Sequence, residues 1–378
     1  MVRGLIIILM ALDHARDFFG DPAADPTNLA TTTAPLFFTR WITHFCAPAF
    51  FLLTGTGAFL SLGRMTRVEL SRFLLTRGIW LIILELTVMR FALQFNFDYR
   101  LTIVTVLWAL GWAMIGLAGL VWLPIWLIAA IGAAMVAGHN LLDGISTASF
   151  GALAPLWTVL HAPGFLVHTR RFSLFISYVL IPWIGVTALG FALGRLLAAD
   201  AGRRRAWLLR LGLGLIVAFL ILRFADCYGD PSPWSARPSA LWTLMSFLNT
   251  TKYPPSLLFL LMTLGPVLLL LRLFDGGIPG IIRPALVLGR VPLFFYVLHF
   301  FLIHLLATLA SFLRYGRVGE MFRSPDMAHF PFSAPSGWGA GSAVVCAVWI
   351  GVLLILYPLC RWYDGIKRRN NAWWLGYL

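Results

Sequence analysis

The chain has 378 residues, of which 60% are hydrophobic and only 12% charged, and its mean hydropathy is +0.85. Soluble domains carry about 25% charged residues, so this composition excludes a water-soluble protein. The formal net charge of +14 does not indicate nucleic acid, because the basic residues cluster in short segments between apolar stretches, as membrane topology requires. We expect one integral membrane domain over residues 1–378 and no nucleic-acid partner.

Apolar stretches recur along the whole chain, and a helix needs about 20 such residues to cross a bilayer. Residues 1–19 resemble a signal peptide, but charged residues rather than a small-residue cleavage site end the apolar run, so we interpret it as a membrane helix. The sequence therefore predicts an all-α, polytopic transmembrane bundle of about ten helices. The predicted spans are 2–19, 36–62, 78–97, 101–118, 120–138, 172–196, 206–225, 255–273, 290–313 and 337–360.

Three longer connections, 139–171, 226–254 and 314–336, are rich in Pro, Gly, Trp and Asp and can include interfacial or re-entrant pieces. The nearly uncharged stretch 101–138 can be divided differently, so the number of spans is open there. With a cytoplasmic N-terminus, the inside loops collect most of the basic residues and the outside loops most of the acidic ones. This distribution predicts both termini in the cytoplasm.

Ionisable residues inside a membrane helix cost at least ~2.5 kcal/mol each, so each is a candidate functional residue. The first predicted helix ends in Asp13, His14, Ala15, Arg16 and Asp17. Side chains three or four residues apart share a helix face, so His14 can meet Asp17, and Asp13 can meet Arg16 or Asp17. A carboxylate beside an imidazole fixes its tautomer and raises its basicity, as a general base requires. The alternative is a charged cap that only marks the end of the helix.

Three further histidines lie inside predicted spans, and two of them, His44 and His299, are candidate site residues, whereas His304 points elsewhere. Arg40 and His44 are one turn apart in the second helix, at a depth similar to that of His14, so the two imidazoles can face one site in the outer third of the membrane. In the ninth span Tyr296 and His299 share a helix face, with His299 near mid-membrane. The alternative is that each histidine is satisfied separately by its own neighbours.

The segment 249–256 leads into the eighth predicted helix from the outer side. It holds Asn249, Tyr253 and Lys252, which is one of two lysines in the chain, followed by two prolines that make the helix entrance rigid. Lys252 and Asn249 can bind a sugar or an anion. The predicted substrate-binding residues are Arg40, Asn249, Lys252, Tyr253 and Tyr296. The alternative is that this segment only marks the start of the helix, which would explain the prolines but not the whole cluster.

Glu85 and Arg90 in the third predicted helix are five residues apart, which is a poor spacing for pairing on a helix. We expect each to find a partner on another helix, in a structural intramembrane ion pair. The segment 54–57, Thr-Gly-Thr-Gly, lies inside a span and is predicted to pack helices through small residues. The sequence contains no nucleotide-binding glycine loop, HExxH or GxSxG motif, and the cysteines lack metal-ligand spacing, so no metal is expected.

Four segments, in this order, give the chain its resemblance to a known family. Residues 3–14 resemble the first-helix pattern "LRG-apolar run-His" of the integral-membrane acyltransferase superfamily. Residues 49–55 resemble its "FF-apolar-SG" second helix, and residues 71–77 its paired arginines at the third helix. Residues 289–299 resemble its late "G-apolar-Y-apolar-H" segment. Within the superfamily, the chain is similar to the bacterial branch of the heparan-α-glucosaminide N-acetyltransferase catalytic-domain-like family.

The resemblance implies a membrane enzyme that moves an acetyl or acyl group from cytosolic acetyl-CoA, or another acyl-CoA, to a sugar or glycan hydroxyl or amine at the outer face. It implies catalytic roles for His14, Asp13, Asp17, His44 and His299. The inner basic surface would bind the CoA phosphates, although positive-inside topology also explains these residues. The cofactor-binding candidates are Arg64, Arg67, Arg72 and Arg77.

The chain departs from the animal members of the family, which place a key histidine in the loop after the first helix. Here that loop, residues 20–35, contains no histidine, and His44 stands where the second helix would carry an aspartate. An acetyl-histidine relay in the loop therefore cannot be carried over. We expect direct transfer, in which His14 deprotonates the acceptor while His44 or His299 orients it or stabilises the oxyanion.

Two other functions fit the same sequence. A transporter or flippase of a small polar or lipid-linked molecule would use intramembrane polar residues without covalent chemistry, and a non-catalytic partner of an envelope-polymer assembly machine is a third option. The expected location is a bacterial cytoplasmic (inner) membrane. The expected partners are acyl-CoA, the sugar or glycan acceptor and the lipid bilayer. A homodimer is a further option.

Overall fold

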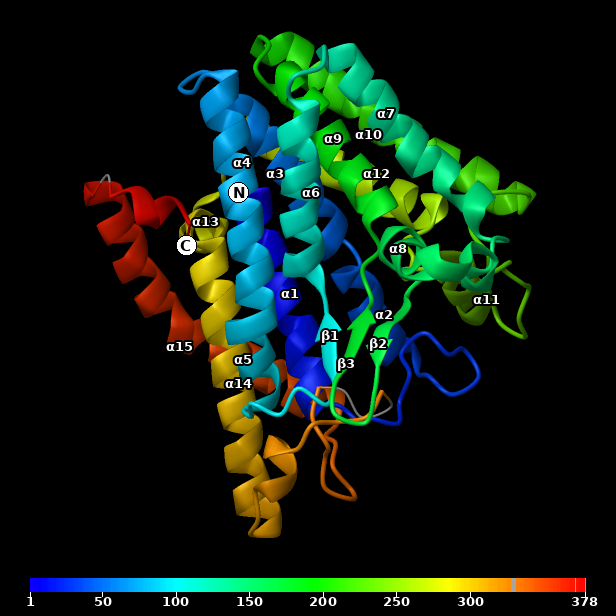
Figure 1. Cartoon of the computed structure of the whole chain (residues 1–378), viewed down its shortest axis with the longest axis vertical. Helices are drawn as coiled ribbons and strands as arrows, with labels where there is room; N and C mark the ends of the chain where they lie inside the picture. Colours follow the sequence, from blue (N-terminus) through cyan, green and yellow to red (C-terminus); the bar gives the residue numbers. More distant parts are fainter. Residues whose placement is uncertain (328–330, 371, 378) are drawn as a thin grey trace.

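Long helices dominate the computed structural model, which describes residues 1–327, 331–370 and 372–377 (Figure 1). Residues 328–330 of the third predicted connection lie outside the described part. Within that part, seven helical segments are long and apolar enough to cross a membrane. They are α2–α3 (Ala34–Ser61), α7 with its 3-10 extension (Ile125–Leu142), α9 (Leu180–Leu197), α10 (Ala201–Ala225), α12 (Leu257–Asp275), α14 (Pro292–Tyr315) and α15 (Ser342–Arg369).

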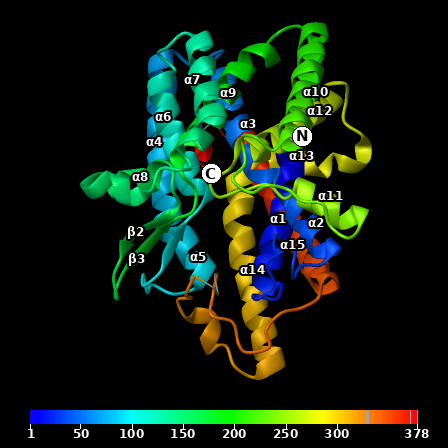
Figure 2. The same ribbon diagram turned by 90° about the vertical axis from the view of Figure 1, so that its right-hand side faces the viewer.

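Three more helices belong to the same bundle. They are α1 (Val2–Phe19), α6 (Val106–Leu120) and α4 (Arg67–Leu84), which continues through a π-helical turn (Glu85–Met89) into α5 (Arg90–Gln94). Helix α1 lies in the centre, where it packs against α2, α3, α13, α14 and α15 (Figures 1 and 2). The helices of the described residues confirm the all-α polytopic bundle, and their number is close to the expected one of about ten.

Both ends of the chain lie on one side of the bundle, in the upper half of the view in Figure 1. The first turn of α1 packs against the short helix α13 (Pro284–Arg290), where Arg3 Nε donates to the Gly289 carbonyl oxygen at 2.5 Å. Asp364 near the end of α15 accepts from Arg290 Nη1 at 3.3 Å. The shared side agrees with the predicted topology, and its cytoplasmic exposure stays a prediction.

A small three-stranded sheet stands where two helices were predicted to begin. Strand β1 (Thr102–Val104) pairs in parallel with β3 (Ser173–Ile176), which pairs antiparallel with β2 (Gly164–His168). The β2–β3 hairpin projects from the side of the helices (Figure 2). The predicted starts at 101 and 172 were therefore wrong, because short runs of β-branched and aromatic residues preceding each helix pair with one another instead of extending it.

The helix that carries the third predicted span begins before residue 78. Helix α4 begins at Arg67, after a capping box in which the Thr66 side chain and Glu69 satisfy each other's backbone N–H groups. Thr-x-x-Glu is a strong helix-start signal, but a search for apolar residues passes over it. Arg67, Arg72 and Arg77 consequently lie on a helix rather than in a loop.

The predicted second span, 36–62, is a broken helix. Helix α2 (Ala34–Thr43) ends at His44, and α3 (Cys46–Ser61) begins two residues later with Pro48 in its first turn. Proline is tolerated there because the first backbone N–H groups of a helix have no intrahelical acceptor. The break places His44 at a helix end inside the bundle, where its side chain is buried.

The connections between the spans contain short helices. The connection 139–171 holds a 3-10 turn (His139–Leu142), a second one (Thr147–Leu153) and α8 (Ala154–Leu160) before β2. The connection 226–254 holds α11 (Ala240–Leu248), and 3-10 turns occur at Gly280–Ile282, Gly319–Phe322 and Trp373–Gly376. Whether these pieces lie at the membrane interface stays a prediction.

Glycines allow α3 and α9 to pack backbone to backbone. A Cβ atom on Gly55 would overlap the Thr187 carbonyl oxygen, and one on Gly190 would overlap the Leu52 carbonyl oxygen. Thr56 Oγ1 donates across the same contact to the Gly190 carbonyl oxygen at 3.0 Å. Gly57, by contrast, faces open space. Small residues in membrane helices permit such close approach, so the packing expected of residues 54–57 is carried by Gly55 and not by Gly57.

We predict that Gly55→Ala destabilises the protein by about 1–3 kcal/mol, because the added methyl group must push α9 away. Gly57→Ala is the matched control on the same helix, and it is expected to be neutral or slightly stabilising because alanine is the better helix former. Thermal unfolding of the purified protein in detergent measures both. Equal melting temperatures for the two variants would contradict the close α3–α9 contact.

Candidate functional site

Helices α1 and α14 bring two histidines into direct contact. His14 Nδ1 lies 2.6 Å from His299 Nε2, and His299 Nδ1 lies 3.0 Å from the Phe295 carbonyl oxygen. A carbonyl oxygen only accepts hydrogen bonds, so His299 Nδ1 carries the proton and, in a neutral ring, His299 Nε2 is the acceptor. His14 must then donate from Nδ1, which leaves the lone pair of its Nε2 free to accept a proton.

This arrangement replaces the carboxylate partner that the sequence predicted for His14. Neither Asp13 nor Asp17 hydrogen-bonds the ring among the described contacts, whereas His299 fixes its tautomer from the opposite side. His299 is fully buried and lines neither of the cavities described below. Both ring nitrogens of His299 are already engaged, by His14 and by the Phe295 carbonyl oxygen. His299 can therefore hold the His14 ring in place, but it has no free N–H group to donate to an oxyanion in either cavity.

The Asp13 carboxylate joins α1 to α2. It accepts from Arg40 Nη1 at 2.9 and 3.0 Å, from Thr43 Oγ1 at 2.7 Å, and from Arg16 one turn along α1. Arg16 also donates to Asp17 at 3.0 Å. The predicted Asp13–Arg16 contact is thereby confirmed. The Asp13 side chain is 11% exposed and that of Asp17 41%, so Asp13 is the buried anchor of the cluster.

Two cavities adjoin at these helices. The loop-side cavity, about 890 Å³, is bounded by the loop after α1 and by residues 249–253. The arginine-side cavity, about 320 Å³, reaches the first turn of α1 and the middle of α4, where Arg3 and Arg77 line it. The residues that line both cavities, and so form the boundary between them, are Asp13, His14, Val106, Tyr178, Lys252 and Tyr296.

Most of the predicted catalytic and substrate residues line the loop-side cavity. This set consists of Asp13, His14, Asp17, Arg40, His44, Asn249, Lys252, Tyr253 and Tyr296. His14 and His44 thus share one cavity, as their matching depths predict. His44 packs edge-to-face on Phe259 at 5.3 Å between ring centres, and its Nδ1 has no hydrogen-bond partner in the described part of the chain.

The four arginines predicted to bind CoA separate in the structure. Only Arg77 lines the arginine-side cavity, while Arg64, Arg67 and Arg72 are exposed and line neither cavity. Successive helix residues are rotated by about 100°, so two side chains five residues apart on α4 point roughly 140° away from each other. Arg72 therefore faces outward when Arg77 faces the cavity.

Two residues at the site were missed by the sequence analysis. Arg3 lines the arginine-side cavity, but in the sequence it is indistinguishable from a basic residue that sets topology. Tyr178 lies on the boundary of the cavities beside Tyr253, at 5.4 Å between ring centres. Burial and the Tyr253 hydroxyl raise the pKa of Tyr178 well above its ordinary value, so it remains a neutral hydrogen-bonding group.

Glu85 and Arg90 do not form the predicted ion pair with other helices. Glu85 Oε1 accepts from the backbone N–H and the hydroxyl of Thr105, both at 2.6 Å. Arg90 donates to Asn96 and to the Asp98 carbonyl oxygen in the loop after α5, and to Ser324 Oγ at 3.4 Å. Neutral groups of loops thus take the place of a second buried ion, while Glu85 Oε2 and Arg90 Nε have no hydrogen-bond partner in the described part of the chain.

The bundle and the site define an integral membrane protein with a buried histidine pair where two cavities adjoin. Residues 1–222 match the family model described as "Heparan-alpha-glucosaminide N-acetyltransferase, catalytic", and the chain belongs to this family. No curated protein matches the chain. Family membership supports an acetyltransferase-type membrane enzyme and confirms the resemblance to this family, while the bacterial branch stays a prediction. The match includes His14 and His44 and ends before the segments that supply Lys252, Tyr296 and His299.

We predict that Asp13→Asn destabilises the protein by about 3–5 kcal/mol, because removal of one partner leaves buried guanidinium groups uncompensated. Asp17→Asn is the matched control on the same helix, and its half-exposed side chain should cost no more than about 1 kcal/mol. The midpoint of thermal unfolding in detergent separates the two variants. An unchanged midpoint for Asp13→Asn would contradict the anchoring role.

Proposed function

We propose that the protein transfers an acetyl or acyl group from acyl-CoA to a hydroxyl or amine of a sugar or glycan. The observation that supports this most is the position of His14, which lies on the boundary of two cavities with the lone pair of Nε2 available. A group transfer between two bulky substrates needs a base that both can reach, and chemistry can then occur without either substrate crossing the bundle.

The proposed reaction is direct transfer. His14 Nε2 removes the proton from the acceptor O–H or N–H as that atom attacks the thioester carbonyl carbon. The C–S bond then breaks, and the proton passes from the imidazolium to the departing CoA thiolate. The products are the acylated acceptor and CoA, and no external base, metal or redox partner is required.

The developing oxyanion needs hydrogen-bond donors or a positive charge at the same boundary. Lys252 and Tyr296 line both cavities and carry such groups. His44 lines only the loop-side cavity, and its role is to orient the acceptor. His299 holds the His14 ring, as the 2.6 Å contact between them requires.

The loop-side cavity is the proposed acceptor site. Its volume of about 890 Å³ lies within the range of ligand pockets, roughly 300–1,000 Å³. Its lining mixes aromatic rings with polar and charged groups, which is the combination that recognises sugars through stacking and hydrogen bonds. Asn249, Lys252 and Tyr253 bound this cavity and would contact the acceptor.

The arginine-side cavity is the proposed donor site. It is narrower, about 320 Å³, and largely apolar, which suits the thin acyl-pantetheine arm of acyl-CoA. Arg3 and Arg77 line it and can hold phosphate groups through paired hydrogen bonds. The exposed Arg64, Arg67 and Arg72 would contribute only to the positive field at this side.

The two sites give the transfer a direction. The arginine side holds both chain termini and helix ends rich in basic residues, and from the positive-inside rule we propose that it faces the cytosol. Acyl-CoA would then be taken from the cytosol and the acyl group delivered to an acceptor at the outer face. A bacterial cytoplasmic membrane is the location that we propose.

His14→Gln is expected to lower acyl transfer by about 100-fold to 10,000-fold, the usual contribution of a general base. Release of CoA thiol from acetyl-CoA, with methyl α-glucosaminide as the acceptor, measures the rate in purified protein. His168→Gln on strand β2, outside both cavities, is the matched control and should keep the wild-type rate. Full activity of His14→Gln would rule out this site, and sugar flux into vesicles without thiol release would favour a transporter.

Arg77→Ala is expected to raise KM for acetyl-CoA about tenfold or more, since a hydrogen bond to a charged group is worth about 1.5–3 kcal/mol. Arg72→Ala removes an equal charge from the same helix and should leave KM nearly unchanged. S-acetylpantetheine, which lacks the nucleotide phosphates, should show no difference between wild type and Arg77→Ala. Equal effects of the two substitutions would refute the donor site and leave only a surface field.

A further inference from the structure

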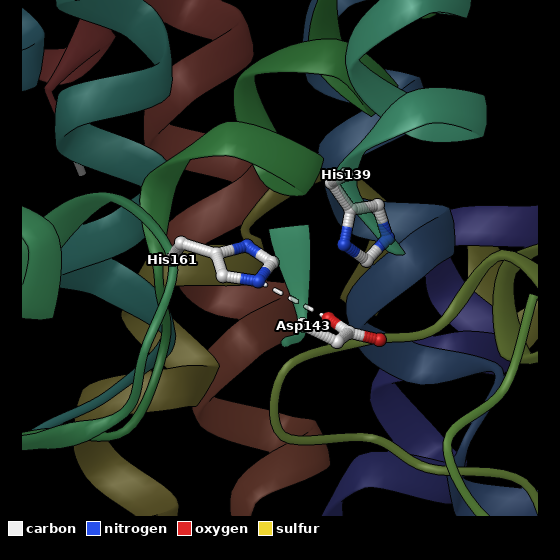
Figure 3. Close-up of side chains that lie close together, drawn as sticks. All are labelled: His139, Asp143 and His161. Atoms are coloured by element: carbon white, nitrogen blue, oxygen red, sulfur yellow. Dashed lines mark ion pairs between the residues drawn. The ribbon is translucent and has the colours of Figure 1, made fainter. Parts of the chain in front are cut away.

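Three side chains of the connection between α7 and β2 converge outside the two cavities. His139 begins the 3-10 turn after α7, Asp143 directly follows that turn, and His161 directly follows α8 (Figure 3). One ligand atom from each of the three lies within 4.8 Å of the others. His161 Nε2 lies 3.1 Å from Asp143 Oδ1. Two imidazoles and a carboxylate form a typical donor set for a divalent transition metal.

Three of the four imidazole nitrogens in this cluster lack a hydrogen-bond partner among the described residues. These are both ring nitrogens of His139 and the Nδ1 atom of His161. His139 is 1% exposed and His161 3% exposed. A buried imidazole without a partner carries a desolvation cost. The rings of His139 and His161 face one another around the Asp143 carboxylate, as Figure 3 shows, so the missing partner would lie among all three.

Neighbouring groups already hold the ligands in place. Asn140 Nδ2 donates to Asp143 Oδ2 at 2.8 Å, which leaves Oδ1 directed at His161. The Pro255 carbonyl oxygen lies close enough to the His139 ring to interact with it. Metal-binding histidines commonly donate their second N–H to a backbone carbonyl, and metal-binding carboxylates are themselves hydrogen-bonded. Asp143 therefore has the outer hydrogen bond of a metal-binding carboxylate, and the Pro255 carbonyl oxygen lies beside the His139 ring.

We propose that His139, Asp143 and His161 form a divalent metal site, filled by zinc. Ligand atoms about 2.0–2.1 Å from a tetrahedral zinc ion lie roughly 3.3 Å apart. The His161–Asp143 pair already has this spacing, and a small rotation of His139 completes it. The Asp143 side chain is 25% exposed, so the fourth position opens to solvent and takes a water molecule.

The site would brace the loop-side cavity. Asn140 Oδ1 accepts from the Leu257 backbone N–H at 2.8 Å, at the first turn of α12. The residues just before that turn include Lys252 and Tyr253, which line the cavity. A metal ion that fixes the turn after α7 thus fixes the segment that carries these two side chains.

The test uses the full chain purified in detergent with any affinity tag removed, stripped with a chelator and titrated with zinc chloride by calorimetry. Wild type should bind one ion per chain. His161→Gln and Asp143→Asn should each weaken binding about 10-fold to 100-fold or more, whereas His168→Gln on the adjacent hairpin and His14→Gln should bind as wild type. Cobalt(II) in place of zinc should give the visible absorption of a tetrahedral ion in wild type and in these two controls, but not in His161→Gln or Asp143→Asn.

Two results would overturn the proposal. One is the absence of stoichiometric binding to wild type, and the other is equal zinc affinity in wild type, His161→Gln and Asp143→Asn. Gel filtration shows whether the His161→Gln protein folds, and Asp143→Asn, at the exposed edge of the site, provides a second variant if it does not. Because the readout is metal binding, its outcome does not depend on whether the protein transfers acyl groups.

Discussion

The Asp13 carboxylate, held by two guanidinium groups and a hydroxyl, determines how α1 sits in the bundle. In a helix the next side chain points about 100° away. Once Asp13 is directed at Arg40 and Thr43 on α2, His14 must therefore face another neighbour of α1, and that neighbour is α14. The contact with His299 and the position on the boundary of the cavities both follow from this rotation. Any change in the Asp13 contacts would turn the histidine away from the site.

Features set by local sequence could be predicted, and those set by distant contacts could not. Apolar runs predicted the helices, because length and hydropathy alone decide whether a segment can span a membrane. Spacing on one helix predicted the Asp13–Arg16 contact. The partner of His14 lies 285 positions away, and no periodicity within either helix indicates which two faces meet. The similar depths of His14 and His44 predicted that they share a site, since depth depends only on the rise per residue.

The arginines and the connection after α7 show two different limits. Charge counting treats Arg64, Arg67, Arg72 and Arg77 alike, yet rotation around α4 separates Arg77 from Arg72. Only a correct helix start, given by the capping box at Thr66, would have allowed that distinction. His139 and Asp143 have helical spacing, but His161 joins them only because α8 folds back toward the turn after α7. Motif searches look for fixed spacings and therefore pass over such a cluster.

The pairing of His14 with a second histidine instead of a carboxylate has an electrostatic reason. Asp13, Asp17, Arg16 and Arg40 together carry two negative and two positive charges, so the cluster next to His14 is neutral as a whole. A carboxylate bonded to the ring would add an uncompensated charge to a buried site, which is expensive away from water. A neutral imidazole fixes the tautomer without that charge. The histidine pair thus adds no charge to this neutral cluster, while the nearby Asp13 carboxylate lowers the energy of the imidazolium that forms when His14 accepts a proton.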